Sequence, residues 1–383
     1  MRSSRQSTGI DSEKRLVHSL LMCVPSEMAG GAHSVVNDLI DELVHMSVDV
    51  SIASVSSHSI ALTNARDPSC RIVRRRHRWL GHDSISLAHH IEQTGIQIVH
   101  CHLSAFLLGA VSARLAHVPS VRTIHGRLDR PGMLSYRERI PFWISIHILA
   151  QKVVAVSDKV TLDLQKYYGL RKGINLFEIA NGCAFDHPAA GASPVEDDER
   201  FGFVFVGRFE EAKGFPELVN AFRRLCAVNH RVRLYLVGDG PCKRIVDPTL
   251  LDSGAIVQSK GWVSREEVRR FLQRSRVFVL PSHSEGLSIT LLEAMSAGLV
   301  PLVSKAATGS NVVRDRLNGI VFETKSEDDL LAQMRWLASG DAPLPRYRLA
   351  AVASVTRDFN ISTMTQRHVE MYEKLVSSSR GRS

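Results

Sequence analysis

The sequence lacks the features that mark several protein classes. Its six cysteines lie scattered, without a Cys-x-x-Cys pair or a neighbouring histidine cluster, which argues against a disulfide framework and a zinc site. No apolar run approaches the roughly 20 residues that a membrane-spanning helix needs. Short repeats are absent, and only the Ser- and Arg-rich ends are of low complexity. With 383 residues, 44% of them hydrophobic and 23% charged, the chain fits a globular protein of two domains in a reducing cytoplasm.

The start of the chain has two interpretations. Lys14 and Arg15 precede the apolar run 16–24, as basic residues do in a secretory signal peptide. The run is short, contains His18 and lacks a small-x-small cleavage site, so a buried first strand is the favoured interpretation.

The net charge of +9 indicates an anionic partner without identifying it. The excess lies in the second half, where 27 basic residues face 19 acidic ones from Arg200 onward. In the first half, the segment 71–79 surrounds Trp79 with arginines, which suits anionic lipid headgroups, although a solvated basic loop explains it equally well. Nucleic-acid binding would require basic and aromatic residues interleaved on one surface, and only this segment has them.

Hydrophobic patterning predicts alternating strands and helices. In residues 32–46 apolar side chains recur at helical spacing, and Asp38 is among the polar residues expected on the other face. The predicted strands are 16–24, 48–55, 96–99, 121–124, 152–156, 203–206, 232–237, 277–280 and 300–303. The predicted helices are 32–46, 106–116, 216–228, 264–275, 288–297 and 326–338, and the fourth of them opens with the capping box Ser264 and Glu267. Residues 187–199 have no periodicity and read as a linker, so two α/β halves with parallel sheets should face each other across a cleft.

Two glycine-containing loops follow predicted strands. Gly30-Gly31 lets a ligand approach the backbone at a helix N-terminus, although a tight turn is the more common reason for such a pair. Arg208 follows the strand 203–206, and Lys213 begins the next helix. Two cations at the carboxyl end of a strand can hold a diphosphate and stabilise its developing charge, and a solvated loop is the alternative.

Two glutamates are separated by seven residues. Glu285 lies in the loop after the strand 277–280, and Glu293 lies among the apolar residues of the following helix. A carboxylate in apolar surroundings needs a partner, either sugar hydroxyls or a structural ion pair. The spacing corresponds to about two helical turns, which would place both carboxylates on the cleft side.

These motifs, in this order, resemble the GT-B glycosyltransferases of the large retaining family 4 over nearly the whole chain. Besides the Gly-Gly loop and the two glutamates, the matching pieces are 98–102, 123–126, 154–157, 181–182, 206–208, 213–214, 236–241 and 261–263. The resemblance implies an α/β GT-B fold with two Rossmann-like domains, 1–186 and 200–360, and a C-terminal helix at about 361–380 that packs back on the first domain. The second domain would bind a nucleotide diphosphate-sugar, and the first a glycan or lipid-linked acceptor.

The resemblance also implies roles for single residues. Arg208 and Lys213 would hold the diphosphate. Glu285 would bind hydroxyls of the donor sugar, Glu293 would bind the ribose, and His125 would lie beside the transferred sugar. The other implied substrate contacts are Gly30, Gly31, His102, Gly207, Gly261, Trp262, Val263, Gly286, Leu287 and Ser288.

No cofactor is expected. The chain contains no Asp-x-Asp triplet, so Arg208, Lys213 and helix ends would replace a metal at the diphosphate. We expect a cytoplasmic, metal-independent hexosyltransferase that retains anomeric configuration, acts on polysaccharide or lipopolysaccharide intermediates, weakly contacts an anionic membrane surface and binds no nucleic acid. A GT-B enzyme that epimerises or hydrolyses a nucleotide-sugar is the alternative. The chain departs from the family pattern at 32–33, 183–184 and 308–312, which leaves the sugar open.

Overall fold

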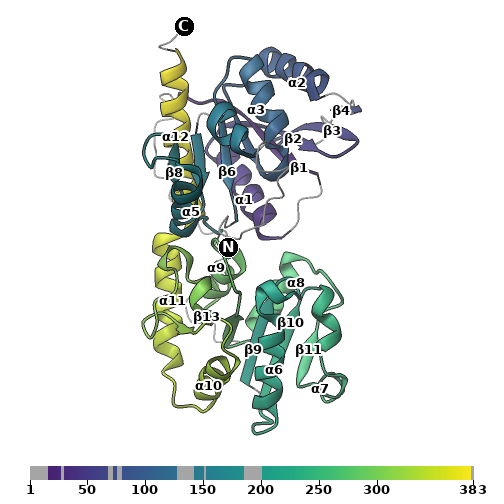
Figure 1. Cartoon of the computed structure of the whole chain (residues 1–383), viewed down its shortest axis with the longest axis vertical. Helices are drawn as coiled ribbons and strands as arrows, with labels where there is room; N and C mark the ends of the chain where they lie inside the picture. The colour runs from purple at the N-terminus through teal and green to yellow at the C-terminus, as the bar shows by residue number, and fades with distance from the viewer. Residues whose placement is uncertain are drawn as a thin grey trace, which may run out of the picture.

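The computed structural model describes residues 16–26, 30–67, 72–75, 80–126, 142–150, 152–184 and 201–380. Two α/β halves lie end to end, each built around its own sheet (Figure 1). The linker predicted at 187–199 lies outside the described residues, as does most of the segment 71–79.

The first half has an eight-stranded sheet in the order β4-β3-β2-β1-β5-β6-β7-β8. Its strands are β1 (Ser19–Pro25), β2 (Asp49–Val55), β3 (Ser59–Asn64), β4 (Ile72–Arg75), β5 (Ile98–His102), β6 (Ser120–Ile124), β7 (Lys152–Ala155) and β8 (Leu176–Glu178). Its helices are α1 (Gly31–His45), α2 (Leu80–Thr94), α3 (Phe106–Leu115) and α5 (Asp158–Tyr168), with a π-helical turn at Ser145–Leu149. The prediction that 16–24 forms a buried strand is confirmed, since β1 lies buried beside β2 and β5.

Two strands at one edge of this sheet differ from the all-parallel prediction. β3 pairs antiparallel with β2 and with β4, and neither strand was predicted. The turn between β2 and β3 is closed by Ser56, whose Oγ accepts hydrogen bonds from the backbone N–H groups of His58 and Ser59. A turn this short leaves no room for a crossover helix, so the two strands run in opposite directions.

The second half has a six-stranded parallel sheet in the order β11-β10-β9-β12-β13-β14. Its strands are β9 (Phe201–Val206), β10 (Val232–Val237), β11 (Ile256–Gln258), β12 (Val277–Leu280), β13 (Val300–Ser304) and β14 (Ile320–Phe322). Its helices are α6 (Phe215–Cys226), α7 (Pro248–Asp252), α8 (Arg265–Gln273), α9 (Ile289–Ser296), α10 (Glu327–Ala338) and α11 (Leu344–Asp358). All predicted strands and helices of this half are present, and the capping box at Ser264 and Glu267 is confirmed.

The apolar runs of this sheet are buried on both faces. Phe203 and Phe205 of β9 pack into one hydrophobic cluster, while Val204 and Val206 pack into another on the opposite face. Side chains alternate between the two faces of a strand, so covering both faces requires a continuous apolar run.

The chain crosses between the halves twice. After α11 in the second half, the last helix α12 (Ile361–Arg380) lies along the first half (Figure 1). The two crossings run side by side, since the N–H of Cys183 donates to Phe359 and the N–H of Ile361 donates to Cys183. A Cβ on Gly182 would lie 2.7 Å from the carbonyl oxygen of Asn360, so glycine permits this close approach.

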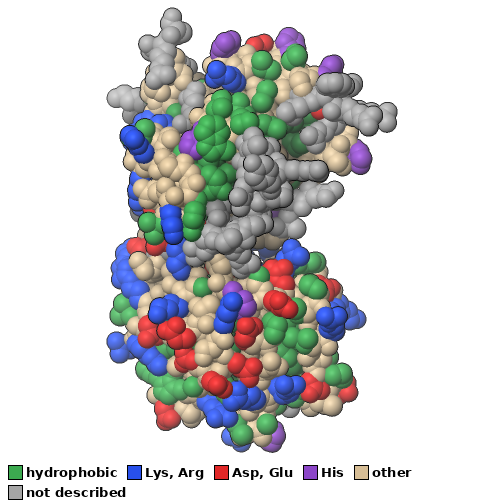
Figure 2. All heavy atoms as spheres, viewed as in Figure 1, with side chains coloured by type: hydrophobic (Ala, Val, Ile, Leu, Met, Phe, Trp, Pro, Cys, Tyr) green, Lys and Arg blue, Asp and Glu red, His purple; other side chains and the backbone are tan. Residues whose placement is uncertain are grey.

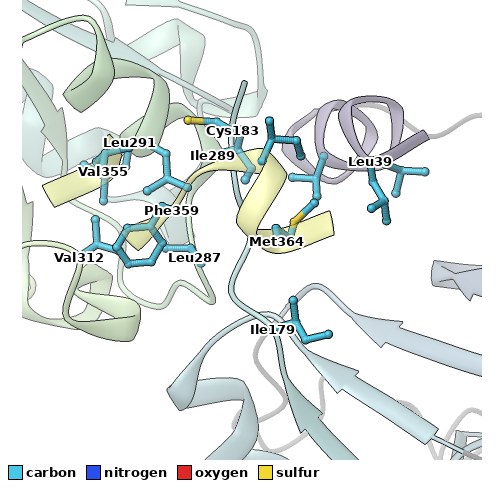
Figure 3. Packing of buried hydrophobic residues seen from close by; sticks show 14 of the residues in the cluster. Leu39, Ile179, Cys183, Leu287, Ile289, Leu291, Val312, Val355, Phe359 and Met364 are labelled. Carbon is cyan, nitrogen blue, oxygen red and sulfur yellow. The ribbon is translucent and has the colours of Figure 1, made fainter. Parts of the chain in front are cut away.

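One hydrophobic cluster extends over both halves and both crossings. Figure 3 shows that side chains of this cluster come from α1 (Leu39), from the crossings (Cys183, Phe359, Met364) and from α9 (Leu291). The carboxyl ends of the two sheets are therefore held against each other by apolar burial. On the visible surface of the second half, Lys and Arg side chains are interspersed with Asp and Glu (Figure 2).

Candidate active site at the boundary of the two halves

Two glycine contacts bring the strand-end loops of the halves together. Gly31, at the start of α1, lies against Ile289, and a Cβ on Gly31 would be 3.4 Å from that side chain. Gly286 lies under the end of β6, where its Cβ would be 3.0 Å from the carbonyl oxygen of His125. Gly30 has a φ of 78° and open space around it. The predicted first-half and second-half loops therefore meet.

A cation and a carboxylate meet at the switch point of the second sheet. β9 lies between β10 and β12. From β10 the chain continues to β11 at one edge of the sheet, and from β12 it continues to β13 toward the other edge. Open parallel sheets bind ligands at the point where the strand order reverses in this way. Lys213 follows β9, Glu285 follows β12, and Lys213 Nζ donates to Glu285 Oε1 at 2.5 Å. The carboxylate also accepts from Ser282 Oγ at 2.9 Å. Lys213 is 29% exposed and Glu285 12% exposed, so the pair is accessible from one side.

The backbone around Lys213 depends on glycine. Gly214 has a φ of 66°, and a Cβ there would lie 2.1 Å from the carbonyl oxygen of Pro281. Gly207 precedes Arg208, which is 63% exposed with its Nε 3.5 Å from Glu210. Because Gly214 is the N-cap of α6, Lys213 lies at the positive end of that helix.

The loop between the two glutamates ends at the cap of α9. Ser288 Oγ accepts from the N–H of Leu291, and the helix begins at Ile289. The expectation that about two helical turns separate the glutamates is wrong, because Glu285 lies in the loop before the helix. Leu287 is buried, so what Gly286, Leu287 and Ser288 present at this helix end is mainly backbone.

Glu293 forms an ion pair with Arg265 of α8 at 3.0 Å. Arg265 also makes a bidentate pair with Asp38 of α1, at 2.7 and 2.9 Å. Asp38 is 7% exposed, so its placement on the solvent face of the helix is wrong; it faces the other half of the molecule. Burial raises the pKa of Glu293, and the Arg265 guanidinium partly offsets that shift. The structural ion pair is thus present at Glu293, and a ribose would compete with Arg265 for this carboxylate.

We expect Arg265→Ala to lower the free energy of unfolding by about 2 kcal/mol, since it leaves two partly buried carboxylates without their cation. Arg270→Ala on the same helix is the control, because Arg270 pairs with the exposed Glu266 and such pairs contribute about 0.5 kcal/mol or less. Urea unfolding measures both variants. Equal free energies of unfolding for the two variants would show that the ion pairs of Arg265 across the boundary do not stabilise the protein.

His125 lies at the end of β6 and contacts His102 of β5, with His125 Nε2 3.0 Å from His102 Nδ1. Burial, with a smaller contribution from His368, lowers the pKa of His125 to about 4. Burial likewise holds the pKa of His102 well below its usual value. Both rings are therefore neutral at pH 7, and one of them donates a hydrogen bond to the other.

The remaining predicted contacts lie after β10 and β11. Gly261 has a φ of 80°, and its Cβ would come within 3.4 Å of Asp239 Oδ2. Trp262 is 62% exposed, and Val263 is partly buried against the shared cluster. These residues lie in the second half.

Sequence reasoning missed Asp38 and Arg265 as partners across the boundary. It also missed His368 and Tyr372 of α12, which pack beside the histidines of β5. Two observations limit the chemistry of the described part of the chain. No group of three His, Cys, Asp or Glu side chains there can hold a metal ion, and none of its helices is long and apolar enough to cross a bilayer.

Two family models match the sequence, one in each half. The model described as "Glycosyltransferase Family 4" matches residues 29–182, and the model described as "Glycosyl transferases group 1" matches residues 189–350. Together they extend over every strand of the two sheets except β1 and over every predicted site residue.

Individual proteins are more distantly similar. An uncharacterized glycosyltransferase of Methanocaldococcus jannaschii is 26% identical over 63% of this chain and 65% of its own length. The putative teichuronic acid biosynthesis glycosyltransferase TuaC of Bacillus subtilis is 27% identical over 61% of this chain and 59% of its own. The chain therefore spans less than two thirds of these relatives. The structure of Anabaena HepE in complex with UDP-glucose superposes with a TM-score of 0.72 at 16% identity, over 93% of this chain and all of that one.

Proposed function

Because the chain belongs to the group 1, family 4 glycosyltransferases and has the GT-B fold, we propose that it transfers a sugar from a nucleotide diphosphate-sugar to a glycan or lipid-linked acceptor. The observation that carries this proposal is the pair Lys213 and Glu285 at the switch point of the second sheet, where Gly286, the residue after Glu285, lies against the backbone of His125 in the first half. HepE was solved with UDP-glucose, and TuaC is named for teichuronic acid biosynthesis, which supports a nucleotide-sugar donor and a glycan acceptor.

The second half would hold the donor. Lys213 and Arg208 face the negative diphosphate, together with the N-termini of α6 and α9. As the bond between the anomeric carbon and the diphosphate oxygen breaks, negative charge grows on that oxygen, and fixed cations stabilise it without a metal. Glu285 would accept hydrogen bonds from the sugar hydroxyls, and Glu293 from the ribose.

Retention follows if the acceptor attacks from the face that the diphosphate leaves. The acceptor oxygen then bonds to the anomeric carbon, and its proton passes to the departing diphosphate oxygen. Glu285 is a poor nucleophile for a double displacement, because Lys213 offsets its charge and Ser282 occupies the same oxygen. His125, neutral, would orient the sugar by hydrogen bonding.

A thermal-shift series with UDP-, GDP- and ADP-sugars, each with and without EDTA, tests the donor site. We expect one nucleotide class to raise the unfolding midpoint, since a ligand at a hundredfold over its Kd adds about 2.7 kcal/mol to stability. EDTA should leave the shift unchanged. A shift that appears only with manganese or magnesium would contradict the metal-free site, and no shift with any nucleotide-sugar would contradict the donor proposal. Release of sugar without acceptor would favour the epimerase or hydrolase alternative.

Contact with an anionic membrane rests on the sequence of segment 71–79. Each basic side chain near an anionic leaflet contributes about 1 kcal/mol, which fades within a Debye length. We expect vesicles of anionic lipid to carry the protein in a flotation assay at low salt and to release it at high salt. Equal flotation of the triple variant Arg74→Ala, Arg75→Ala, Arg76→Ala and the parent would show that these arginines do not bind the membrane. The loop interpretation is already wrong for Ile72–Arg75, which form β4.

A further inference from the structure

A polar layer lies between the first sheet and α12. Side chains two residues apart share a face of a strand, so His100 and His102 of β5 point to the same side as Thr123 of β6, and His125, which directly follows β6, contacts His102 on that side. α12 covers that side, because Tyr372 Oη lies 2.6 Å from His100 Nδ1. The predicted site residue His125 is therefore backed by other buried polar groups rather than by an apolar core.

The layer holds His102 in a fixed orientation. The ring of His102 is 1% exposed and lies 4.2 Å, centroid to centroid, from the ring of His100. His100 is anchored at both nitrogens, with Tyr372 Oη at Nδ1 and Thr123 Oγ1 2.7 Å from Nε2. His102 has one polar contact of its own, the 3.0 Å contact between its Nδ1 and Nε2 of His125.

This contact leaves two buried nitrogens to account for. His102 Nε2 and His125 Nδ1 have no hydrogen-bond partner in the described structure. Since both rings are neutral, one proton lies in the contact, and two arrangements are possible. Either His102 donates from Nδ1 and His125 carries its proton on Nδ1, or His125 donates from Nε2 and presents a bare Nδ1. A buried polar atom without a partner is costly, so a ligand group at His125 Nδ1 would satisfy one of these two nitrogens, while His102 Nε2 keeps no partner among the described residues.

We propose that His102 is a positioning residue whose Nδ1 accepts a hydrogen bond from the Nε2–H of His125, which leaves the Nδ1 lone pair of His125 for a hydroxyl of the transferred sugar. In this arrangement both rings carry the proton on Nε2, the tautomer that a free imidazole side chain favours, and the hydrogen bond to one nitrogen fixes the state of the other. The proposal rests on the proposed function for the identity of the hydroxyl. The hydrogen bond between the rings does not depend on it.

Nitrogen NMR of the protein labelled on histidine nitrogens tests the tautomer without a ligand. A protonated ring nitrogen and a bare one differ in chemical shift and in their couplings to ring protons, and His125→Gln identifies the signals of His125. We expect the parent to show a bare Nδ1 and a protonated Nε2 at His125, and His102→Leu to show a mixture of the two tautomers. A protonated Nδ1 in the parent, or an unchanged spectrum in His102→Leu, would overturn the proposal.

Kinetics of transfer provide the second readout. We expect His102→Leu to lower kcat about tenfold while the KM for the donor changes less than about twofold. Loss of a residue that only orients another residue lowers the rate of the reaction more than it weakens substrate binding. Asn places an amide oxygen where Nδ1 of His102 lies, so His102→Asn should bring kcat to within about threefold of the parent. Gln reaches toward the position of Nε2 and should not restore the rate. Equal rates of the Asn and Leu variants would reject the positioning role while leaving the proposed function intact.

Should the Leu variant fail to fold, the spectrum of the parent still decides the tautomer. If the parent transfers no sugar from any donor, the proposed function is wrong. The NMR spectra then still show whether His102 determines the tautomer of His125.

Discussion

Lys213→Ala is expected to lower kcat/KM for sugar transfer by about a hundredfold or more while the protein stays folded. Removal of one group that stabilises developing charge typically costs a factor of about 100 to 1,000. Lys213 lies in a short turn outside the hydrophobic clusters, so its loss leaves the packing intact. Glu285→Gln should lose activity to a similar degree, because the neutral amide pairs poorly with both Lys213 and sugar hydroxyls.

A matched control separates this effect from a general loss of charge. Lys172 also pairs with a glutamate, Glu178, at 2.8 Å, but on the outer strand of the first sheet. Steady-state rates of Lys172→Ala should equal those of the parent. If folded Lys213→Ala enzyme had the same rate as the Lys172→Ala control, Lys213 would have no role in binding the diphosphate.

Acid is expected to destabilise the protein strongly between pH 6.5 and 4. Burial lowers the pKa of His125 and His368 to about 4, and it holds those of His100 and His102 well below the usual value. In the unfolded chain these histidines bind protons near pH 6.5, whereas in the folded chain they stay neutral until the pH is near 4. The free energy of unfolding is therefore highest above pH 6.5 and falls as the pH drops toward 4. A shift from 6.5 to about 4 corresponds to about 3 kcal/mol for one histidine, a large part of a typical total stability.

His368→Gln removes one of these groups from α12. Urea unfolding between pH 7 and pH 5 should then show a shallower loss of stability, by up to about 1.4 kcal/mol per pH unit. His58→Gln is the control, because His58 is exposed on the turn between β2 and β3. Identical pH profiles for the parent and His368→Gln would mean that burial at α12 does not oppose protonation.

The architecture was largely accessible from the sequence because buried strands and amphipathic helices leave strong periodic patterns. The strand β9 is a continuous apolar run since both of its faces are covered, and α8 is introduced by a complete capping box. The antiparallel strand β3 was missed because a two-strand hairpin closed by Ser56 has no Gly or Pro signal. Short strands such as β8, β11 and β14 were missed because three residues carry too little pattern.

The candidate site was accessible only in part. Lys213 and Glu285 are far apart in sequence, yet both follow a strand, and the switch-point rule brings such residues together. Asp38 and Arg265 lie on helices of different halves, and helical periodicity assigns a polar residue to solvent unless a partner from elsewhere buries it. The same limit applies to Tyr372, whose contact with His100 depends on the return of the last helix to the first sheet.

We propose that this chain moves a sugar from a nucleotide diphosphate-sugar to an acceptor and retains the configuration of the sugar. The most direct measurement follows an α-linked, isotopically labelled sugar from the nucleotide that passes the thermal-shift screen, in the presence of lipid-linked and polysaccharide acceptors, and determines the anomeric configuration of the product by NMR. We expect the product to contain one α-linked sugar for each nucleoside diphosphate released. A β-linked product, or free sugar released at the same rate with and without acceptor, would contradict it.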